Sequence, residues 1–323
     1  MSSSPTVLAL SGGVGGAKLS LGLARVLPPG ELAVLVNTGD DFDHLGLRIC
    51  PDLDTVTYTL GGIVHPEQGW GRAEESFGVM NELRRHGGPD WFLLGDRDLV
   101  LHLERTRRLA ARERLTTIAA SFADRFGVHT RVLPMSDSPV ATRVETEVGE
   151  LAFQHYFVRL RCAPRVSSIR FAGAAEARPT EELLMLLRQP ALRAIVLCPS
   201  NPYLSIDPIL AVSGMRTALR AAGVPIVAVS PLIGGRAVKG PTAKLMQELG
   251  VPTEPAAIVR HYAGLLDGVV LDDSDAAQVP ALESLGLRVA LTATLMRSLE
   301  DRERVAQVAL GLAESLTAQR GAA

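Results

Sequence analysis

Residues 7–18 read VLALSGGVGGAK, an apolar run that passes into a glycine-rich turn and then into a helical pattern. A turn of this kind at the start of a helix leaves backbone N–H groups open to an anion, so the stretch predicts a βα unit with a phosphate site. It is not a Walker A loop, because Ala17 and Leu19 stand where that motif needs glycine and a hydroxyl residue, and its spacing does not match GxGxxG. A tight βα turn without a ligand is the alternative. The residues expected to bind phosphate here are Gly12, Gly13, Gly15, Gly16 and Lys18.

Beyond this unit, short apolar runs alternate with helical spacing along most of the chain, which predicts a doubly wound α/β fold with a mostly parallel sheet. The expected strands are 7–10, 32–37, 91–94, 194–198, 225–230, 268–271 and 287–291. The expected helices are 18–27, 74–85, 115–126, 181–188, 208–221, 242–249, 255–262 and 302–318. Residues 129–171 differ, with β-rich segments at 142–147 and 151–160 between prolines. They predict a small β-rich subdomain inserted into a core made of residues 1–128 and 172–323.

Carboxylates concentrate after the second expected strand. Five lie within fifteen residues: Asp40, Asp41, Asp43, Asp52 and Asp54. Ligands bind at the carboxyl ends of parallel strands, and carboxylates packed this closely need a cation, hydrogen-bond donors or solvent to offset their repulsion. Such an oxygen-rich site favours Mg²⁺ together with substrate phosphates. A solvated acidic loop is the alternative.

Three further segments are expected at the same sheet edge. LGDRD at 94–98 would bring Arg97 to a phosphate and Asp98 to a proton or a metal. PSNPY at 199–203 and SPLIGGRAVKGP at 230–241 each follow an expected strand and offer small polar side chains and cations. Structural loops are the alternative for each segment taken alone.

Composition excludes several classes of protein. The chain has 323 residues with 33 Lys and Arg against 35 Asp and Glu, so a net charge of −2 argues against nucleic-acid binding. The basic cluster at 105–114 is interpreted as a solvated helix face. Three separated cysteines offer no disulfide framework, and neither a signal peptide nor an 18-residue apolar run is visible, so a soluble cytoplasmic protein is expected. The histidine spacing argues against zinc, and a nucleophile elbow is missing.

These motifs, taken together and in order, resemble the 2-phospho-L-lactate transferase family of deazaflavin coenzyme F-420 biosynthesis. The resemblance rests on SGGVGGAK at 11–18, NTGDDFDHLGLRICPDLDTV at 37–56, LGDRDLVLH at 94–102, PSNPYLSIDPIL at 199–210 and SPLIGGRAVKGP at 230–241, with GWG at 69–71 and RVLPMSD at 131–137. It spans nearly the whole chain. It implies a Rossmann-like nucleotide-binding fold and a homodimer. The implied reaction is a magnesium-dependent transfer of a phosphorylated three-carbon acid from a guanosine-diphosphate-linked donor to the deazaflavin Fo, with release of GMP.

The resemblance also implies roles for individual residues. Asp40 would be the leading metal ligand, and Asp54 would contact the deazaflavin or the metal, while Ser200 and Asn201 would hold the donor with the glycine-rich loop. Phosphoryl transfer needs positioning and charge neutralisation rather than a covalent nucleophile, which agrees with this assignment. Further candidates are Asn37 and Lys239 for the nucleotide and its phosphates, Asp41 for the acceptor, and Asp54, Arg97 and Asp98 for catalysis.

Several points stay open from the sequence. The acid could be lactate, enolpyruvate or glycerate, and the general base could be Asp41, Asp54 or Asp98. Two other functions are compatible with the motifs: a nucleotide-sugar-binding regulator without catalysis, and a guanylyltransferase that makes the donor. With 4% aromatic residues, the deazaflavin ring is expected to lie against aliphatic side chains, with Trp70 and Trp91 as exceptions.

Overall fold

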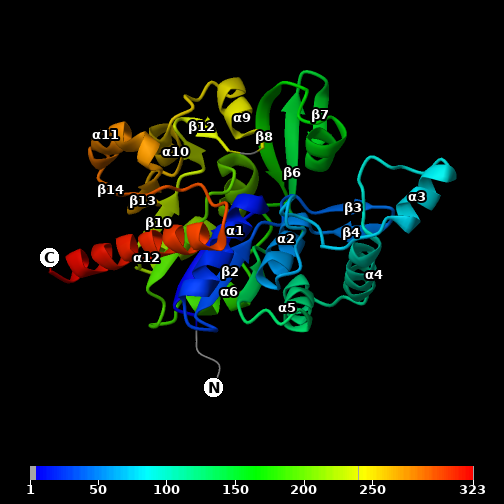
Figure 1. Cartoon of the computed structure of the whole chain (residues 1–323), viewed down its shortest axis with the longest axis horizontal. Helices are drawn as coiled ribbons and strands as arrows, with labels where there is room; N and C mark the ends of the chain where they lie inside the picture. The colour runs from blue at the N-terminus through cyan, green and yellow to red at the C-terminus, as the bar shows by residue number, and fades with distance from the viewer. Residues whose placement is uncertain (1–4, 239, 323) are drawn as a thin grey trace.

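A seven-stranded parallel sheet forms the centre of the computed structural model, which describes residues 5–238 and 240–322 (Figure 1). Its strand order is β14-β13-β10-β9-β1-β2-β5. The strands are β1 (Val7–Ser11), β2 (Leu32–Val36), β5 (Arg131–Pro134), β9 (Ala194–Leu197), β10 (Ile226–Val229), β13 (Gly268–Leu271) and β14 (Arg288–Leu291). The expected doubly wound α/β fold is therefore confirmed. The direction of strand order reverses between β1 and β9, which pair in parallel from Val7 with Ala194 to Leu10 with Leu197.

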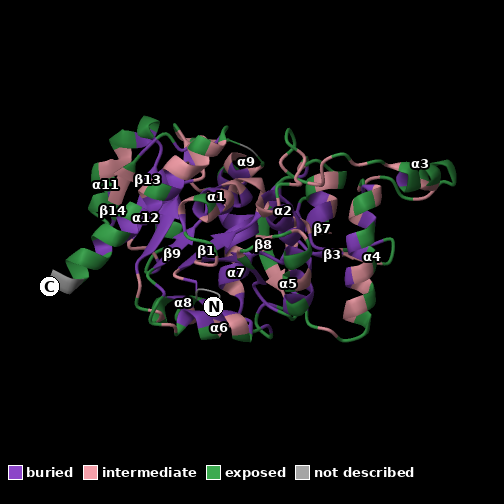
Figure 2. Cartoon of the chain, turned by 60° about the horizontal axis from the view of Figure 1, so that its bottom comes forward, coloured by how far each residue is buried: buried purple, intermediate pink, exposed green. Residues whose placement is uncertain are grey.

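Helices cover both faces of this sheet, so successive side chains of β1 enter two different cores. Val7 and Ala9 pack with α1 (Gly13–Val26), α2 (Pro51–Leu60), α5 (Leu115–Arg125) and α12 (Leu299–Ala322). Leu8 and Leu10 face the opposite layer, which contains α6 (Glu181–Leu187), α7 (Asp207–Ala211), α8 (Met215–Ala221), α9 (Thr242–Glu248) and α10 (Pro255–His261). Figure 2 shows the strands buried between these layers and the exposed residues on the outer sides of the helices. Burial on both faces explains the continuous apolar runs in the sequence.

The 129–171 segment contains both core and insertion. A three-stranded antiparallel sheet of order β7-β6-β8 consists of β6 (Ala141–Thr146), β7 (Gly149–Ala152) and β8 (Val166–Ala172). The strand expected over 151–160 is wrong beyond Ala152, because the chain turns into a short π-helix, η1 (His155–Arg159). Residues 131–134, which the sequence placed in the insertion, form β5, the strand that pairs with β2 at the edge of the main sheet.

The strand expected over 91–94 is also wrong. These residues lie in a loop, and Leu94 packs with Ile49 and Met80 in a small separate core. That core belongs to a lobe, formed by β3 (Phe42–His44), β4 (Leu47–Ile49), α3 (Gly78–Arg85) and α4 (Asp96–Ala110), which projects from the sheet at the right of Figure 1. An apolar run of four residues does not distinguish a buried strand from a loop that fills a small core.

Among the described residues, the α-helices α2, α4 and α11 (Val279–Glu283) lie outside the expected helical ranges, although the basic cluster at 105–114 was interpreted as a helix face. Helix α2 begins at Pro51, a favoured first helical position, and α4 follows Gly95 with Asp96 and Asp98 in its first turn. Of the helices in the described ranges, none is both long and apolar enough to cross a bilayer.

Candidate functional site

The glycine-rich turn lies at the switch point of the sheet, between the ends of β1 and β9. Ser200, just after β9, accepts a hydrogen bond from the Gly12 backbone N–H (3.1 Å) and donates one to the Gly12 carbonyl (2.8 Å). A Cβ atom on Gly12 would lie 2.6 Å from Ser205 Cβ, and one on Gly15 would lie 2.5 Å from the Pro199 carbonyl oxygen. These glycines are therefore required for close packing of the two loops. This is the place where doubly wound folds bind ligands.

Gly13 differs from its neighbours, because a Cβ there would have no described atom within 4 Å. Its φ of +62° is left-handed, and its N–H donates to Asp52 Oδ1 at 2.8 Å. Asn37 Nδ2 donates to the other oxygen of Asp52 at 3.0 Å, while Asn37 Oδ1 accepts from the Gly39 N–H at 2.7 Å. Burial raises the pKa of Asp52 to about 6 although both hydrogen bonds lower it. Asp52 thus holds the glycine-rich loop, Asn37 and α2 together, a role that the sequence did not assign to it.

Asp40 and Asp41 lie buried beside this group. Burial, followed by the charge of Asp52, raises the pKa of Asp40 well above its ordinary value. The antiparallel insertion contacts Asp40 through Thr142 Oγ1, 3.4 Å from Asp40 Oδ1, and through Gln154 Nε2, which donates to the Asp40 carbonyl at 3.2 Å. Burial raises the pKa of Asp41 to about 7, although the charge of Arg48 and an interaction with the Cys50 thiol lower it. Within 5–238 and 240–322, neither of its carboxylate oxygens accepts a hydrogen bond from an N–H or O–H group.

Asp54 points from α2 toward α4, where the buried Arg105 forms an ion pair with its Oδ1. His102 lies one turn earlier on α4, with Nδ1 3.8 Å from Asp54 Oδ2. Burial lowers the pKa of His102 to about 4, so at neutral pH the histidine is uncharged. The interpretation of Arg105 as part of a solvated face is wrong. The spacing of Leu99, His102 and Arg105 on one side of α4 was the signal that could have identified it.

Asp98 and Arg97, adjacent in sequence, have different surroundings in the first turn of α4. Asp98 lies beside Tyr58, and burial raises the pKa of Asp98 to about 7. Arg97 is half exposed and pairs with Glu74 at 3.4 Å. Because 91–94 is not a strand, neither residue lies at the end of one, as the sequence had suggested.

The remaining predicted phosphate ligands have structural partners or lie elsewhere. Lys18 Nζ donates to the Met296 carbonyl at 3.0 Å. Asn201 accepts from the backbone N–H groups of Tyr203 and Leu204 and donates to Thr242 Oγ1 at 3.0 Å, which fixes the loop after β9. Gly16 has no room for a Cβ, which would lie 2.5 Å from Ser200 Oγ. Lys239 lies outside the described residues.

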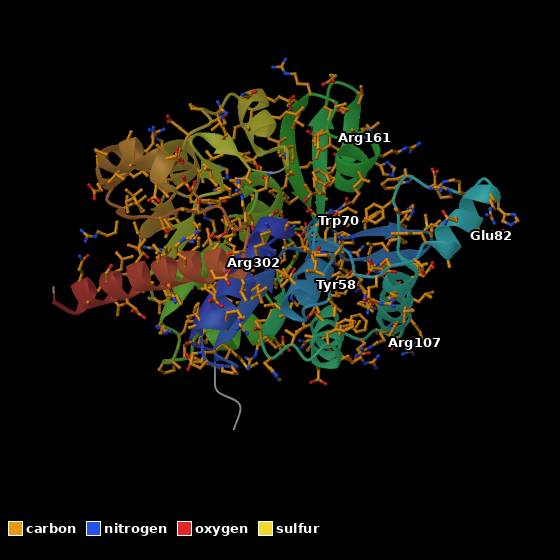
Figure 3. All side chains as sticks on the ribbon, viewed as in Figure 1. Tyr58, Trp70, Glu82, Arg107, Arg161 and Arg302 are labelled. Carbon is orange, nitrogen blue, oxygen red and sulfur yellow. The ribbon has the colours of Figure 1, made fainter. Side chains whose placement is uncertain are left out.

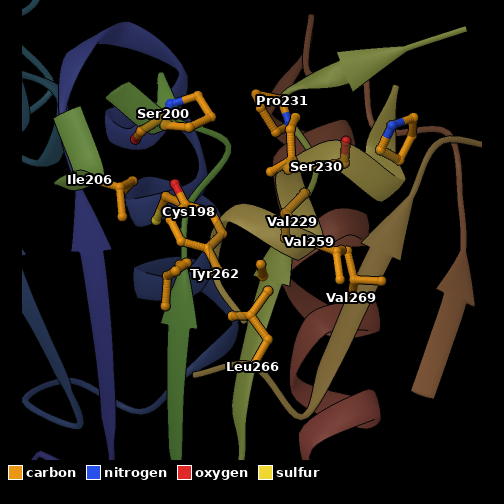
Figure 4. Close-up of a pocket in the computed structure, with 15 residues that line it drawn as sticks. Cys198, Ser200, Ile206, Val229, Ser230, Pro231, Val259, Tyr262, Leu266 and Val269 are labelled. Atoms are coloured by element: carbon orange, nitrogen blue, oxygen red, sulfur yellow. The ribbon is translucent and has the colours of Figure 1, made fainter. Parts of the chain in front are cut away.

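An apolar pocket lies below the loops that follow β9 and β10, with Ser200 and Ser230 near its upper end and Leu266 near its lower end (Figure 4). Its volume of about 10 Å³ has room for roughly one water molecule. A nucleoside or a deazaflavin needs a far larger space, so this pocket is a packing gap beside the site.

One group of aromatic rings lies at the base of the projecting lobe. Trp91 contacts His155 (centroids 4.6 Å apart), His44 (5.1 Å) and Phe42 (6.1 Å), and Phe92 packs against Phe42 at 4.8 Å. Trp70 is 52% exposed (Figure 3). Trp91 therefore belongs to an aromatic group that includes Phe42, the residue that follows Asp41.

The side chains can be tested for their fit to a magnesium ion. Within the described ranges, no group of three or more His, Cys, Asp or Glu side chains is placed to hold a metal. Mg²⁺ does not require such a group, because it commonly takes one or two carboxylates with substrate phosphates and water. The buried oxygens of Asp41, which accept no hydrogen bond from an N–H or O–H group in the structure as described, and the adjacent Asp40 carboxylate meet that requirement.

Comparison with known proteins identifies relatives of this chain. The model of the family described as 2-phospho-L-lactate transferase CofD matches residues 7–286. The chain is 42% identical over 318 residues to a phosphoenolpyruvate transferase of Streptomyces griseus, covering 97% of this chain and 99% of that protein. It is 40% identical over 324 residues to one of Thermobifida fusca, covering 96% and 98%.

Solved structures show a related fold. A crystal structure of a member of the UPF0052 family from Bacillus halodurans superimposes with a TM-score of 0.64, covering 95% of this chain and 99% of that one. Its sequence identity to this chain is 16%, so the likeness concerns the fold alone.

Proposed function

Since the chain belongs to the 2-phospho-L-lactate transferase CofD family, we propose that it transfers a phosphoenolpyruvyl group from a guanosine-diphosphate-linked donor to the deazaflavin Fo. The products are GMP and a phosphorylated deazaflavin intermediate of coenzyme F-420 biosynthesis. The choice of enolpyruvate among the three acids rests on relatives named phosphoenolpyruvate transferase that are 40–42% identical to this chain.

The reaction is a substitution at phosphorus. The terminal ribityl hydroxyl of Fo attacks the phosphorus that bears the acid, and a new P–O bond forms. The bond between that phosphorus and the bridging oxygen of the diphosphate breaks, and GMP leaves with the oxygen. The hydroxyl proton passes to a base. A protein catalyses such a step mainly by positioning the two oxygens in line and by stabilising the developing charge.

One observation carries the proposal: carboxylates from two separate segments converge beside the start of α1 at the switch point of the sheet. Asp52 contacts Gly13 directly, and the charge of Asp52 raises the pKa of Asp40. The α1 N-terminus favours phosphate, whereas the carboxylates favour a cation, and a metal-bound diphosphate offers both charges.

Asp40, with Asp41 beside it, would hold Mg²⁺, and the ion would neutralise charge on the diphosphate. Asp54 has a cationic partner of its own in Arg105, so we place it on the acceptor side rather than at the metal. Asn37 and Ser200 keep the loops around the donor in place through their backbone contacts. Arg97 lies outside this group.

Asp98 is a candidate for the base, and Asp41 is one only where Asp40 holds Mg²⁺ without it. Burial raises the pKa of each to about 7, close to the working pH that suits proton transfer. Asp41 lies on the metal side, whereas Asp98 lies near Tyr58 at the start of α4. Replacing each by Asn and comparing the pH dependence of kcat distinguishes them.

The experiment for this proposal separates it from the two other functions. Purified protein is incubated with the guanylylated donor and Mg²⁺, with and without Fo, and GMP is measured. GMP release that requires Fo supports the transferase. Fo binding, followed by fluorescence, without any turnover would instead favour a binding protein, and consumption of GTP without Fo would favour a guanylyltransferase.

A further inference from the structure

Arg105 is the most deeply buried cation of the candidate site, with 2% of its surface exposed. It lies on α4, and its guanidinium contacts three other elements. Nη2 pairs with Asp54 Oδ1 on α2, and Nη1 donates to the Arg48 carbonyl at 3.2 Å in β4. Its guanidinium carbon is 5.7 Å from the Phe122 ring centroid, so α5 packs on the same group.

The surroundings of Arg105 include two carboxylates, those of Asp41 and Asp54. The titratable groups that face it are the side chains of Asp41, Cys50, Asp54, Tyr58 and His102. His102 Nδ1 is 3.3 Å from Nη1 of Arg105, but the histidine is neutral because burial lowers its pKa to about 4. Charge compensation of Asp54 from within the protein therefore comes from Arg105. A buried guanidinium persists only when it is paired and hydrogen-bonded in this way.

Other arginines on α4 do not share this environment. Arg107 pairs with Glu104 at 2.8 Å on the outer side of the helix (Figure 3). Arg108 pairs with Glu113 near the helix end, away from the carboxylates of the site. The same helix thus supplies a matched control for a substitution at Arg105.

The two carboxylate oxygens of Asp54 are not equivalent. Oδ1 is occupied by Arg105, whereas Oδ2 has no hydrogen-bond partner in the part of the chain that the structure describes. Arg105 holds one oxygen in a fixed place, and the planar guanidinium also fixes the direction of the other. Asp54 Oδ2 is buried, with the uncharged His102 Nδ1 3.8 Å away, so among the described residues it is an acceptor without a hydrogen-bond donor. An anchored carboxylate of this kind can accept a hydrogen bond from a substrate hydroxyl that reaches it.

We propose that Arg105 is a positioning residue for the acceptor: it orients the Asp54 carboxylate so that its second oxygen binds a hydroxyl group of the deazaflavin substrate. This inference rests on the proposed transferase function. It assigns to the acceptor side a residue that neither touches the donor loops nor lies on the same element as Asp54.

The test compares Arg105→Met, Arg105→Lys and the control Arg108→Met in the full-length protein. Arg105→Met is expected to lower kcat/KM for Fo by about 100-fold or more, with KM for the donor unchanged. Arg105→Lys keeps the charge, but an ammonium group cannot contact both Asp54 and the Arg48 carbonyl in the fixed planar geometry of a guanidinium. An intermediate loss of kcat/KM for Fo is therefore expected, and this variant tests the proposal even if Arg105→Met fails to fold. Arg108→Met should stay within about twofold of wild type.

Two results would overturn the inference. One is wild-type kinetic constants for Arg105→Lys, measured well below its melting temperature. The other is an equal loss for donor and acceptor, which a structural role alone would produce. Fo binding is also titrated by fluorescence without turnover, and a weaker affinity is expected in the Arg105 variants. If wild-type protein binds Fo but transfers nothing, the proposed function fails, whereas the binding difference still tests Arg105.

Discussion

At the level of single residues, the glycine-rich turn combines two different requirements. Gly12, Gly15 and Gly16 have no room for a side chain because the loop after β9 packs against them. Gly13 has space but requires a left-handed backbone. A sequence motif that resembles a phosphate loop is therefore explained in large part by the contact between two loops, and only Gly13 opens toward space that a ligand could use.

This difference predicts that substitutions at Gly15 and Gly13 destabilise the protein for different reasons. Gly15→Ala is expected to reduce the free energy of unfolding by about 1–3 kcal/mol, because its methyl group would meet the Pro199 carbonyl oxygen. Gly13→Ala should cost about 1–2 kcal/mol, from backbone strain alone. Unfolding in urea measures both. A Gly15→Ala protein as stable as wild type would show that the loops do not pack as described.

The raised pKa of Asp41 predicts that the free energy of unfolding depends on pH. Its pKa is about 7 in the folded protein against an ordinary 3.8, so the folded state binds the proton more tightly than the unfolded state. Its contribution to stability is complete below about pH 4 and is lost as the pH rises through 7. In Mg²⁺-free buffer, Asp41→Asn should therefore gain on wild type by about 2 kcal/mol between pH 5 and pH 8. Urea unfolding at the two pH values measures this, and a constant difference would contradict it.

At the level of elements, the antiparallel insertion contacts Asp40, in the acidic segment after β2, through β6. Thr142 Oγ1 lies 3.4 Å from Asp40 Oδ1, while its backbone N–H donates to the Gly39 carbonyl at 2.7 Å. Thr142→Val removes the hydroxyl and keeps the shape, so we expect the Mg²⁺ concentration for half-maximal activity to rise about tenfold. Thr146→Val is the matched control, since that hydroxyl donates to Gly149 within the hairpin. If both variants required the same Mg²⁺ concentration for half-maximal activity, the insertion would not contribute to the metal site.

The elements also show what the sequence could and could not predict. Strands buried on both faces, such as β1 and β9, were recognisable from continuous apolar runs. The run at 91–94 looked the same but fills a small core in a loop, because four apolar residues carry no information about which surface they cover. The exposed charges of α4 masked its buried face, so Arg105 was interpreted as part of a solvated helix face.

The sequence predicted where the site lies better than it predicted which residues contact one another there. Acidic residues after β2 and the loops after β1 and β9 were correctly expected at one sheet edge, since that follows from parallel topology. The pairing of Asp54 with Arg105 and of Gly13 with Asp52 depends on how α2 and α4 pack, which local spacing does not encode.

At the level of the whole molecule, a net charge of −2 conceals a strongly uneven distribution. Buried carboxylates gather beside the switch point, and the cations that act on Asp41 and Asp54 come from the projecting lobe, Arg48 on β4 and Arg105 on α4. The lobe therefore contributes charge compensation to a site that the main sheet positions. This division explains why neither composition nor the glycine-rich motif alone identifies the site.

The most direct test of the central claim is the mass of the product formed from Fo when the three guanylylated acids compete in one reaction with Mg²⁺. The account predicts a deazaflavin product whose added mass corresponds to a phosphoenolpyruvyl group, with one GMP released for each product formed. Recovery of Fo at its original mass with all three donors would contradict the proposed transferase.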